Sequence, residues 1–382
     1  MRKFVLIAFV AFLLVCSATD IYAQDKDDKE RTILNQQETQ LLSNFSSILP
    51  SDAKDTFDEM GIDLTSPSSL SEVSVSQIST QIGKIISSQS VGVFSSLGTI
   101  LAVLLLYALV EGFLQSITAQ SMREVLSVVC TLCIACALIV PVTEVIDAAN
   151  TAVKTASNFM LAFVPVMVSV LVSCGKTLAG SGYYSLMIFA AEGIAQLSSK
   201  LITPMLNVFL GVSVCSTIVP DLKLDCITEM FSKTLKWMLS FSFTIFSALL
   251  TFRTLITTSI DNVSTRAVRF TMSSFIPVVG AALSEAYKTV QGSVNILKNG
   301  IGVFAILAVA IVFLPIIIRL ILWNITLSLC KTTSQILGVT VPFGMLKSIS
   351  TVLSVLLAVV ICVMALFIIS TALVITAGGY SS

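Results

Sequence analysis

Six stretches of the chain are apolar over about twenty residues, the length that a helix needs to cross a hydrocarbon core roughly 30 Å thick. Backbone groups in lipid must find their hydrogen bonds within the segment, so we expect each stretch to be helical. The pattern predicts an all-α, polytopic membrane helical bundle over residues 91–382. Its spans are residues 94–114, 125–146, 158–175, 237–256, 300–322 and 349–376.

Residues 183–219 are also apolar, but polar and helix-breaking residues interrupt them: Glu192, Gln196, Lys200, Pro204 and Gly211. This region fits two short spans, one tilted span, or a re-entrant pair. The distribution of basic residues between the two sides of the membrane does not decide among these alternatives. Two spans place eight basic residues inside and seven outside, whereas one span places seven on each side.

Two connections carry a pattern of their own. Residues 221–236 are amphipathic and predict a helix lying along the membrane interface, with Glu229 and Lys233 as an i,i+4 ion pair. Residues 257–299 are too long and too apolar for a simple loop. Within them, residues 275–283 contain Pro277 and Gly280, which permit a broken, re-entrant helix. The alternative is a surface hairpin hinged by glycine.

The N-terminus has the pattern of an exported protein. Arg2 and Lys3 precede an apolar stretch at residues 4–15, which predicts a signal peptide over residues 1–23, cleaved after Ala23 or alternatively after Ala18. Residues 24–90 contain eleven acidic and five basic residues, a net charge of −6. We expect them to form a short extracytoplasmic segment, partly helical and partly disordered, that acts as a tether or as a docking element.

Composition agrees with a membrane protein and excludes much catalytic chemistry. Hydrophobic residues make up 55% of the chain and charged residues 12%. The 22 basic and 22 acidic residues cancel, so no nucleic-acid partner is predicted. The chain contains no histidine, which excludes Ser-His and Cys-His pairs and imidazole metal ligands. We therefore expect no catalytic residue, no cofactor and no metal.

A short cysteine run is the one feature with metal-like spacing. Cys130, Cys133 and Cys136 form the run CTLCIAC inside a predicted span. Ionising three thiols in hydrocarbon is costly, and cysteine is a common small residue of apolar cores. We interpret the three thiols as packing residues.

Ionisable and helix-breaking residues within the membrane body are better candidates for a functional site, because burying a charge there is costly. Glu192 falls on one helical stripe with Ser185, Gln196 and Ser199, which could line an aqueous path or pack against another helix. Within 257–300, Glu285 and Lys298 could pair across a turn. The candidate conduit or assembly residues are Glu192, Gln196, Pro277, Gly280, Glu285, Gly292, Lys298 and Gly300.

Residues 259–302 read SIDNVSTRAVRFTMSSFIPVVGAALSEAYKTVQGSVNILKNGIG. This run resembles the signature stretch of the stage III sporulation protein AE family, and the resemblance extends over most of the membrane body. It implies a membrane component of the channel apparatus that links mother cell and forespore. The implied location is the mother-cell membrane around the forespore, with the N-terminal segment in the intermembrane space.

The resemblance also implies partners. These are the other products of the stage III sporulation operon, including an ATPase-like protein and ring-forming proteins, together with stage II sporulation protein Q. The predicted function is a non-enzymatic subunit of that channel complex. The alternative is an autonomous small-solute permease, because interrupted apolar segments and an intramembrane carboxylate are also found in transporters.

Overall fold

The computed structural model describes residues 54, 55, 57, 58, 75–115, 120–218, 225–275 and 280–376. The predicted signal peptide and most of the acidic segment lie outside these residues. From residue 75 onward the described residues form helices α5 to α11, including one short π-helix, η2. Their bounds are α5 Val75–Gln115, α6 Gln120–Ser173, α7 Thr177–Leu197, η2 Ser198–Ile202, α8 Thr203–Ile218, α9 Asp225–Phe275, α10 Gly280–Ile336 and α11 Thr340–Thr376.

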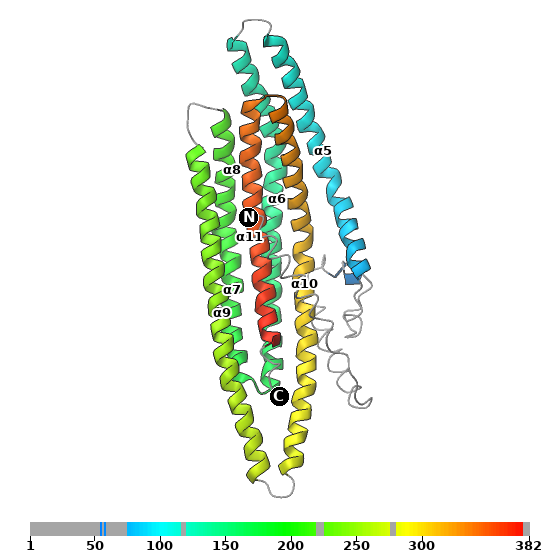
Figure 1. Ribbon diagram of the computed structural model, residues 1–382, viewed down its shortest axis with the longest axis vertical. Coiled ribbons are helices and arrows are strands. Elements are labelled where there is room, and N and C mark those ends of the chain that lie inside the picture. The colour runs from blue at the N-terminus through cyan, green and yellow to red at the C-terminus, as the bar shows by residue number, and fades with distance from the viewer. Residues whose placement is uncertain are drawn as a thin grey trace.

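The helices run along the long axis of the molecule as an elongated bundle (Figure 1). Chain direction alternates between α6, the α7–α8 rod, α9, α10 and α11, and α5 leans against the upper half of the bundle. Within the described residues, six helices are long and apolar enough to cross a membrane. The predicted all-α, multispan class is therefore confirmed.

Three of these helices are much longer than the spans predicted from the sequence. α6, α9 and α10 contain 54, 51 and 57 residues. At a rise of 1.5 Å per residue they are about 77 to 86 Å long, more than twice the thickness of a hydrocarbon core. The helical hairpins α5–α6 and α9–α10 extend beyond the rest of the bundle at its opposite ends (Figure 1).

Helix α6 joins the stretches 125–146 and 158–175, which the sequence analysis treated as separate spans. The intervening residues are polar, but they form an amphipathic helix and not a loop, because their apolar side chains recur at helical spacing. The buried positions are Ile146, Ala149, Val153 and Ala156, and the exposed ones are Asp147, Thr151 and Lys154.

The ambiguous region 183–219 belongs to one continuous helical rod over residues 177–218. The π-helix Ser198–Ile202 interrupts the α-helical hydrogen bonding without breaking the rod. Of the three alternatives, the structure therefore has a single long helix. A π-turn widens the helix by one residue and is often found at functional sites.

The two connections also differ from expectation. Residues 225–236 are the first turns of α9 and continue into 237–256 without a break, so they do not form a separate interfacial helix. The predicted ion pair is present, with Lys233 Nζ 2.8 Å from Glu229 Oε1. Residues 257–275 belong to α9 and residues 280–299 to α10, so these parts of the connection are helical. The centre of the predicted re-entrant stretch, residues 276–279, lies outside the described residues.

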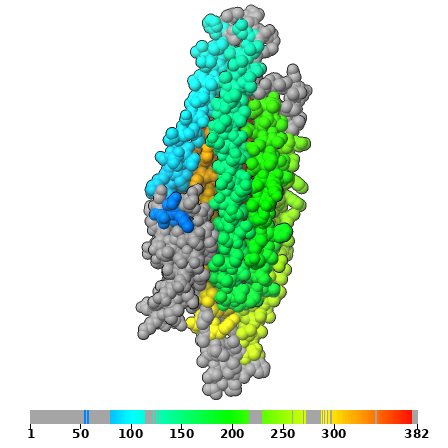
Figure 2. All heavy atoms as spheres, turned by 180° about the vertical axis from the view of Figure 1, so that it is seen from behind, coloured from blue at the N-terminus to red at the C-terminus, as the bar shows by residue number. Residues whose placement is uncertain are grey.

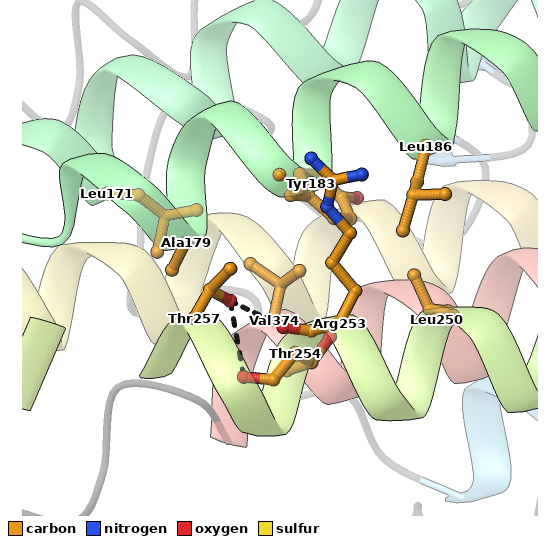
Figure 3. Close-up of a pocket in the computed structure, with 10 residues that line it drawn as sticks. Leu171, Ala179, Tyr183, Leu186, Leu250, Arg253, Thr254, Thr257 and Val374 are labelled. Carbon is orange, nitrogen blue, oxygen red and sulfur yellow. Dashed lines mark hydrogen bonds between the residues drawn. The ribbon is translucent and has the colours of Figure 1, made fainter. Parts of the chain in front are cut away.

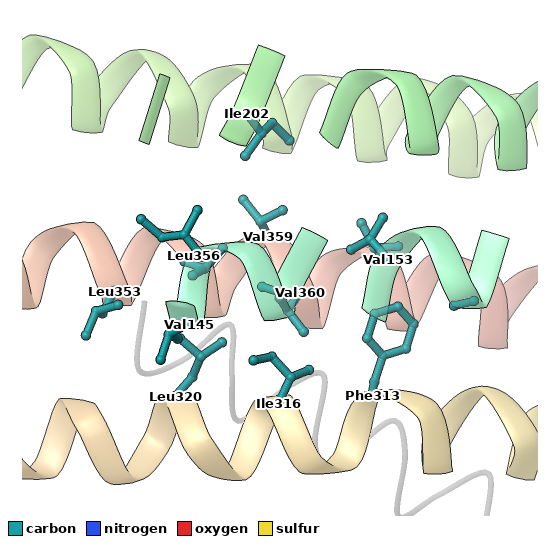
Figure 4. Close-up of a cluster of buried hydrophobic side chains, with 14 of the residues drawn as sticks. Val145, Val153, Ile202, Phe313, Ile316, Leu320, Leu353, Leu356, Val359 and Val360 are labelled. Atoms are coloured by element: carbon teal, nitrogen blue, oxygen red, sulfur yellow. The ribbon is translucent and has the colours of Figure 1, made fainter. Parts of the chain in front are cut away.

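The core lies where α6, α10 and α11 meet (Figure 4). Buried side chains of all three helices pack there: Val145 and Val153 of α6, Ile316 and Leu320 of α10, and Leu353 of α11. The outer segment also reaches this body. Phe57 is fully buried, and its ring stacks on that of Phe304 in α10 with the ring centroids 5.7 Å apart. This contact favours docking over a free tether for that part of the segment.

Candidate functional site

The turn between α6 and α7 is the centre of a buried polar cluster. Gly175 has φ +77°, a conformation that favours glycine. A Cβ at this position would lie 2.9 Å from the hydroxyl of Tyr287 in α10 and 3.9 Å from Oγ1 of Thr265 in α9. Glycine therefore permits both the turn and the close approach of two other helices.

The N-terminus of α7 is capped by a carboxylate from a distant part of the chain. The backbone N–H groups of Leu178 and Ala179 donate hydrogen bonds to Oδ1 and Oδ2 of Asp261, at 3.2 and 2.6 Å. Lys176 occupies the N-cap position and makes no side-chain capping bond. Asp261 is 3% exposed, so a buried anion in α9 satisfies the free donors and faces the positive end of the α7 dipole.

Helix α10 contributes two further bonds to the same end of the bundle. Gln291 Nε2 donates to the carbonyl oxygen of Cys174 at 2.7 Å. Lys298 is fully buried, and its Nζ donates to the carbonyl oxygen of Ile375 at 2.8 Å. Ile375 lies one residue before the end of α11, where carbonyls have no helical partner and a cation is favourable.

We call these residues the polar knot: Cys174, Lys176, Asp261, Gln291, Lys298 and the carbonyl of Ile375. Burial lowers the pKa of Lys176, although the nearby Cys174 and Asp261 act in the opposite direction. Burial likewise raises the pKa of the Cys174 thiol, against the opposing effect of Lys298 and Lys176. The polar knot joins the α6–α7 turn, α9, α10 and the end of α11 into one unit.

The structure places the predicted candidates in different surroundings. Lys298 lies in the polar knot. Gly292 and Gly300 precede and follow Lys298 on α10, and nothing lies within 4 Å of a Cβ built on Gly292. Glu285 is on the same continuous helix as Lys298, thirteen residues and about 20 Å away. The predicted pairing of Glu285 with Lys298 across a turn is therefore wrong. Gly280 is the first residue of α10, and Pro277 lies outside the described residues.

Sequence reasoning identified Lys298 alone among the side chains of the polar knot and missed Cys174, Lys176, Asp261 and Gln291. Asp261 and Gln291 lie in the run 259–302, and Lys176 lies in a short gap between apolar stretches. The charge of Asp261 beside a long apolar segment was a usable signal, because such a charge needs a partner. Its partners are backbone groups 82 and 83 positions away, which no local pattern reveals.

Glu192 and Gln196 lie away from the polar knot, on the surface of α7. Gln196 Nε2 donates to Glu192 Oε1 at 2.9 Å, and both side chains are exposed. Beside them, the hydroxyls of Ser198 and Ser199 each lie 3.2 Å from Oδ1 of Asn150 in α6. The structure therefore confirms that Glu192 and Gln196 share a helical stripe, and it places that stripe next to polar residues of α6.

A small pocket lies between α6, α7, α9 and α11 (Figure 3). Arg253 of α9 extends across it toward α7, where a Cβ on Gly182 would lie 3.2 Å from the Arg253 Nε. Thr257 Oγ1 donates to the Arg253 carbonyl oxygen at 2.8 Å. The aliphatic lining by Leu171, Leu186, Leu250 and Val374 makes this a packing seam around one arginine.

The run CTLCIAC does not form a cluster. Cys130 is buried, whereas Cys133 and Cys136 are exposed on α6. Within the described ranges there is no group of three or more His, Cys, Asp or Glu side chains that could hold a metal ion.

Removing the ammonium group of Lys298 from the polar knot is expected to weaken the bundle. Lys298→Met leaves the Ile375 carbonyl without its donor, so we expect a loss of about 1–2 kcal/mol, measured as a lower melting temperature of the purified protein in detergent. Lys233→Met is the control, because its ion pair with Glu229 is exposed to solvent and such surface pairs contribute little to stability. Equal melting temperatures for Lys298→Met and the unsubstituted protein would contradict this role.

The part of the chain that the structure describes contains six long apolar helices tied together by buried polar groups, which is the architecture of a multi-pass helical membrane protein. The chain belongs to the stage III sporulation protein AE family, which it matches over residues 64–378. It is similar to Stage III sporulation protein AE of Bacillus subtilis (strain 168), with 23% identity over 161 residues. That match covers 42% of this chain and 40% of the relative. No solved structure matches the chain significantly.

The family assignment predicted from residues 259–302 is thus confirmed. The described part of that run supplies four residues around the α6–α7 turn: Asp261, Thr265, Tyr287 and Gln291. It also supplies Lys298, which holds the end of α11. The polar residues of the run therefore act together in the structure, and they hold together helices from both halves of the chain.

Proposed function

We propose that this protein is a non-enzymatic membrane subunit of the channel complex that links mother cell and forespore during endospore formation. Membership of a stage III sporulation family is the observation that carries the proposal. The six helices in the described residues that are long and apolar enough to cross a membrane support a membrane role. The proposed location is the mother-cell membrane around the forespore, with the N-terminal segment in the intermembrane space.

The proposed partners are the other stage III sporulation operon proteins, namely the ATPase-like and ring-forming components, and stage II sporulation protein Q. Two features support a role in assembly. The α5–α6 and α9–α10 hairpins extend beyond the bundle at opposite ends, where partners on either side of the membrane could bind (Figure 1). Much of α9 is exposed and apolar, including Phe241, Phe252 and Val263.

Deleting the gene tests the proposal in the organism that carries it. We expect development to stop after engulfment and forespore gene expression to decline, because the forespore loses its connection to the mother cell. Re-expression of the intact chain should restore spores, and a tagged copy purified from sporulating cells should bring down the ring-forming partners. Normal spore yield in the deletion strain would contradict the proposal.

Liposomes separate this function from the alternative permease. The purified chain, reconstituted alone, is expected to give no more uptake of labelled small solutes than empty liposomes, since a subunit needs its complex. Solute uptake by the chain alone, together with a failure to recover partners, would favour the permease.

A further inference from the structure

A band of charged and polar side chains crosses the open face formed by α6 and α7. On α6 it comprises Glu144, Asp147, Thr151 and Lys154, and on the neighbouring rod it comprises Glu192, Gln196 and Lys200, all of them exposed. The two helices run side by side along one side of the molecule (Figure 2). We call this set the polar band; it lies about midway along both rods.

Apolar surface continues on both sides of the polar band. Toward one end of the bundle the exposed side chains are Ile139, Val140 and Val208, and toward the other end they are Val172 and Phe189. α6 is about 81 Å long, whereas the hydrocarbon core is about 30 Å thick. Wherever the membrane lies along this rod, either the charges meet lipid or an apolar flank meets water. A protein partner that covers this face would avoid both the cost of placing charges in lipid and the cost of exposing apolar side chains to water.

The hydrogen bonds of Ser198 and Ser199 with Asn150 show which residues of α6 and of the α7 rod lie at the same position along the bundle axis. α6 and α7 are antiparallel, so Asp147 and Lys200 lie in the same direction from these bonds and within about one turn of each other. Lys154 and Glu192 lie in the opposite direction, again within about one turn of each other. Each of these two levels therefore carries one acidic and one basic group, whereas Glu144 of the band pairs with Arg319 of α10, at 3.5 Å.

The acidic group and the basic group at each level lie on different helices. Asp147 is on α6 and Lys200 on the α7 side, whereas Lys154 is on α6 and Glu192 on α7. Within the described residues, none of these four side chains forms an ion pair in this chain. The face thus presents two charge pairs of opposite polarity, one above the other.

We propose that the α6–α7 face binds the same face of a second copy of this chain in parallel orientation. A two-fold axis along the membrane normal brings α6 of one copy against α7 of the other at unchanged height. Asp147 then meets Lys200 of the other copy, and Lys154 meets Glu192 of the other copy. Each pair occurs twice, because the contact is symmetric. The charge pattern is self-complementary in this arrangement, which selects a second copy over an unrelated partner.

This inference goes beyond the proposed function, and its test does not depend on sporulation. Two copies of the full chain with different tags are expressed together, extracted in mild detergent, and purified through one tag. We expect Lys154→Glu, and separately Glu192→Lys, to lower recovery of the other tagged copy about threefold or more, the effect of losing an interhelical polar contact. The double variant Lys154→Glu with Glu192→Lys should restore recovery, since it exchanges the two charges.

Lys233→Glu is the control, because it reverses an exposed charge on α9, outside the proposed contact. Unchanged recovery in both single variants would overturn the proposal, and so would loss of recovery without restoration in the double variant. A second measurement does not depend on charge reversal being tolerated. Asp147→Cys in one tagged copy and Lys200→Cys in the other should form an intermolecular disulfide on oxidation, whereas Asp147→Cys with Lys233→Cys should not. Absence of the first cross-linked dimer would also overturn the proposal.

Discussion

Asp261→Ala is expected to destabilise the protein by about 2–4 kcal/mol, because it removes both acceptors from the partly buried N-terminus of α7. The Leu178 and Ala179 N–H groups have Asp261 as their acceptor, at 3.2 and 2.6 Å. The substitution also removes the buried Asp261 carboxylate from the positive end of the α7 helix dipole. Asp261→Asn should have a smaller effect, since its amide oxygen can still accept one of the two bonds.

Two measurements check this prediction. The melting temperature of the purified protein in detergent should fall, and labelling of Cys174 by a maleimide, followed by peptide mass spectrometry, should accelerate. Cys174 is buried and its pKa is raised by that burial, so it reacts slowly while the polar knot is closed. Asn262→Ala, at the next position along α9, is the matched control. Unchanged melting and unchanged labelling in Asp261→Ala would show that the cap does not hold α7.

Gly302→Val is expected to destabilise the contact between α10 and α11 by about 3 kcal/mol, the upper range for overpacking. A Cβ at residue 302 would overlap Cγ1 and Cδ1 of Ile375. The carbonyl of Ile375 accepts the hydrogen bond from Lys298, so a shift of α11 would also strain the polar knot. The destabilisation by Gly302→Val should therefore be larger than the steric overlap with Ile375 alone would cause.

Gly292→Val is the matched control on the same helix, because nothing lies within 4 Å of a Cβ built there. Its melting temperature should stay the same or rise, since replacing a helical glycine removes an entropic cost. The double variant Gly302→Val with Ile375→Ala should be more stable than the sum of the two single effects predicts. Additive effects would mean that the two residues are not coupled, and would contradict the overlap.

The class of fold was predictable from the sequence, because about twenty consecutive apolar residues allow one structure in lipid. The lengths of the helices were not. Residues 147–157 look like a loop by their polarity, although their buried positions recur every three or four residues. Attention to the spacing of Ala149, Val153 and Ala156 would have predicted one helix. Pro204 was also misleading, because it was counted among the interruptions of residues 183–219 although the rod over residues 177–218 continues through it.

The candidate site was predictable only in part. Lys298 was identifiable as a charged residue at the edge of an apolar stretch, and its run resembled a family signature. Its partner is a backbone carbonyl of Ile375, 77 positions away, and backbone groups carry no sequence signal. The same applies to Asp261. The stripe of Glu192 and Gln196 was visible in the sequence, but its alignment with Asp147 and Lys154 depends on how α6 and α7 pack.

The unbroken length of α10 has a mechanical consequence. Its 57 residues run from the α9–α10 hairpin at one end of the molecule to the turn at Gly338 that leads into α11. Pro315 lies inside α10 and lacks the N–H of one helical hydrogen bond, so α10 bends most easily there. A tilt imposed on the α9–α10 hairpin by a bound molecule would therefore be transmitted along α10 as far as Pro315.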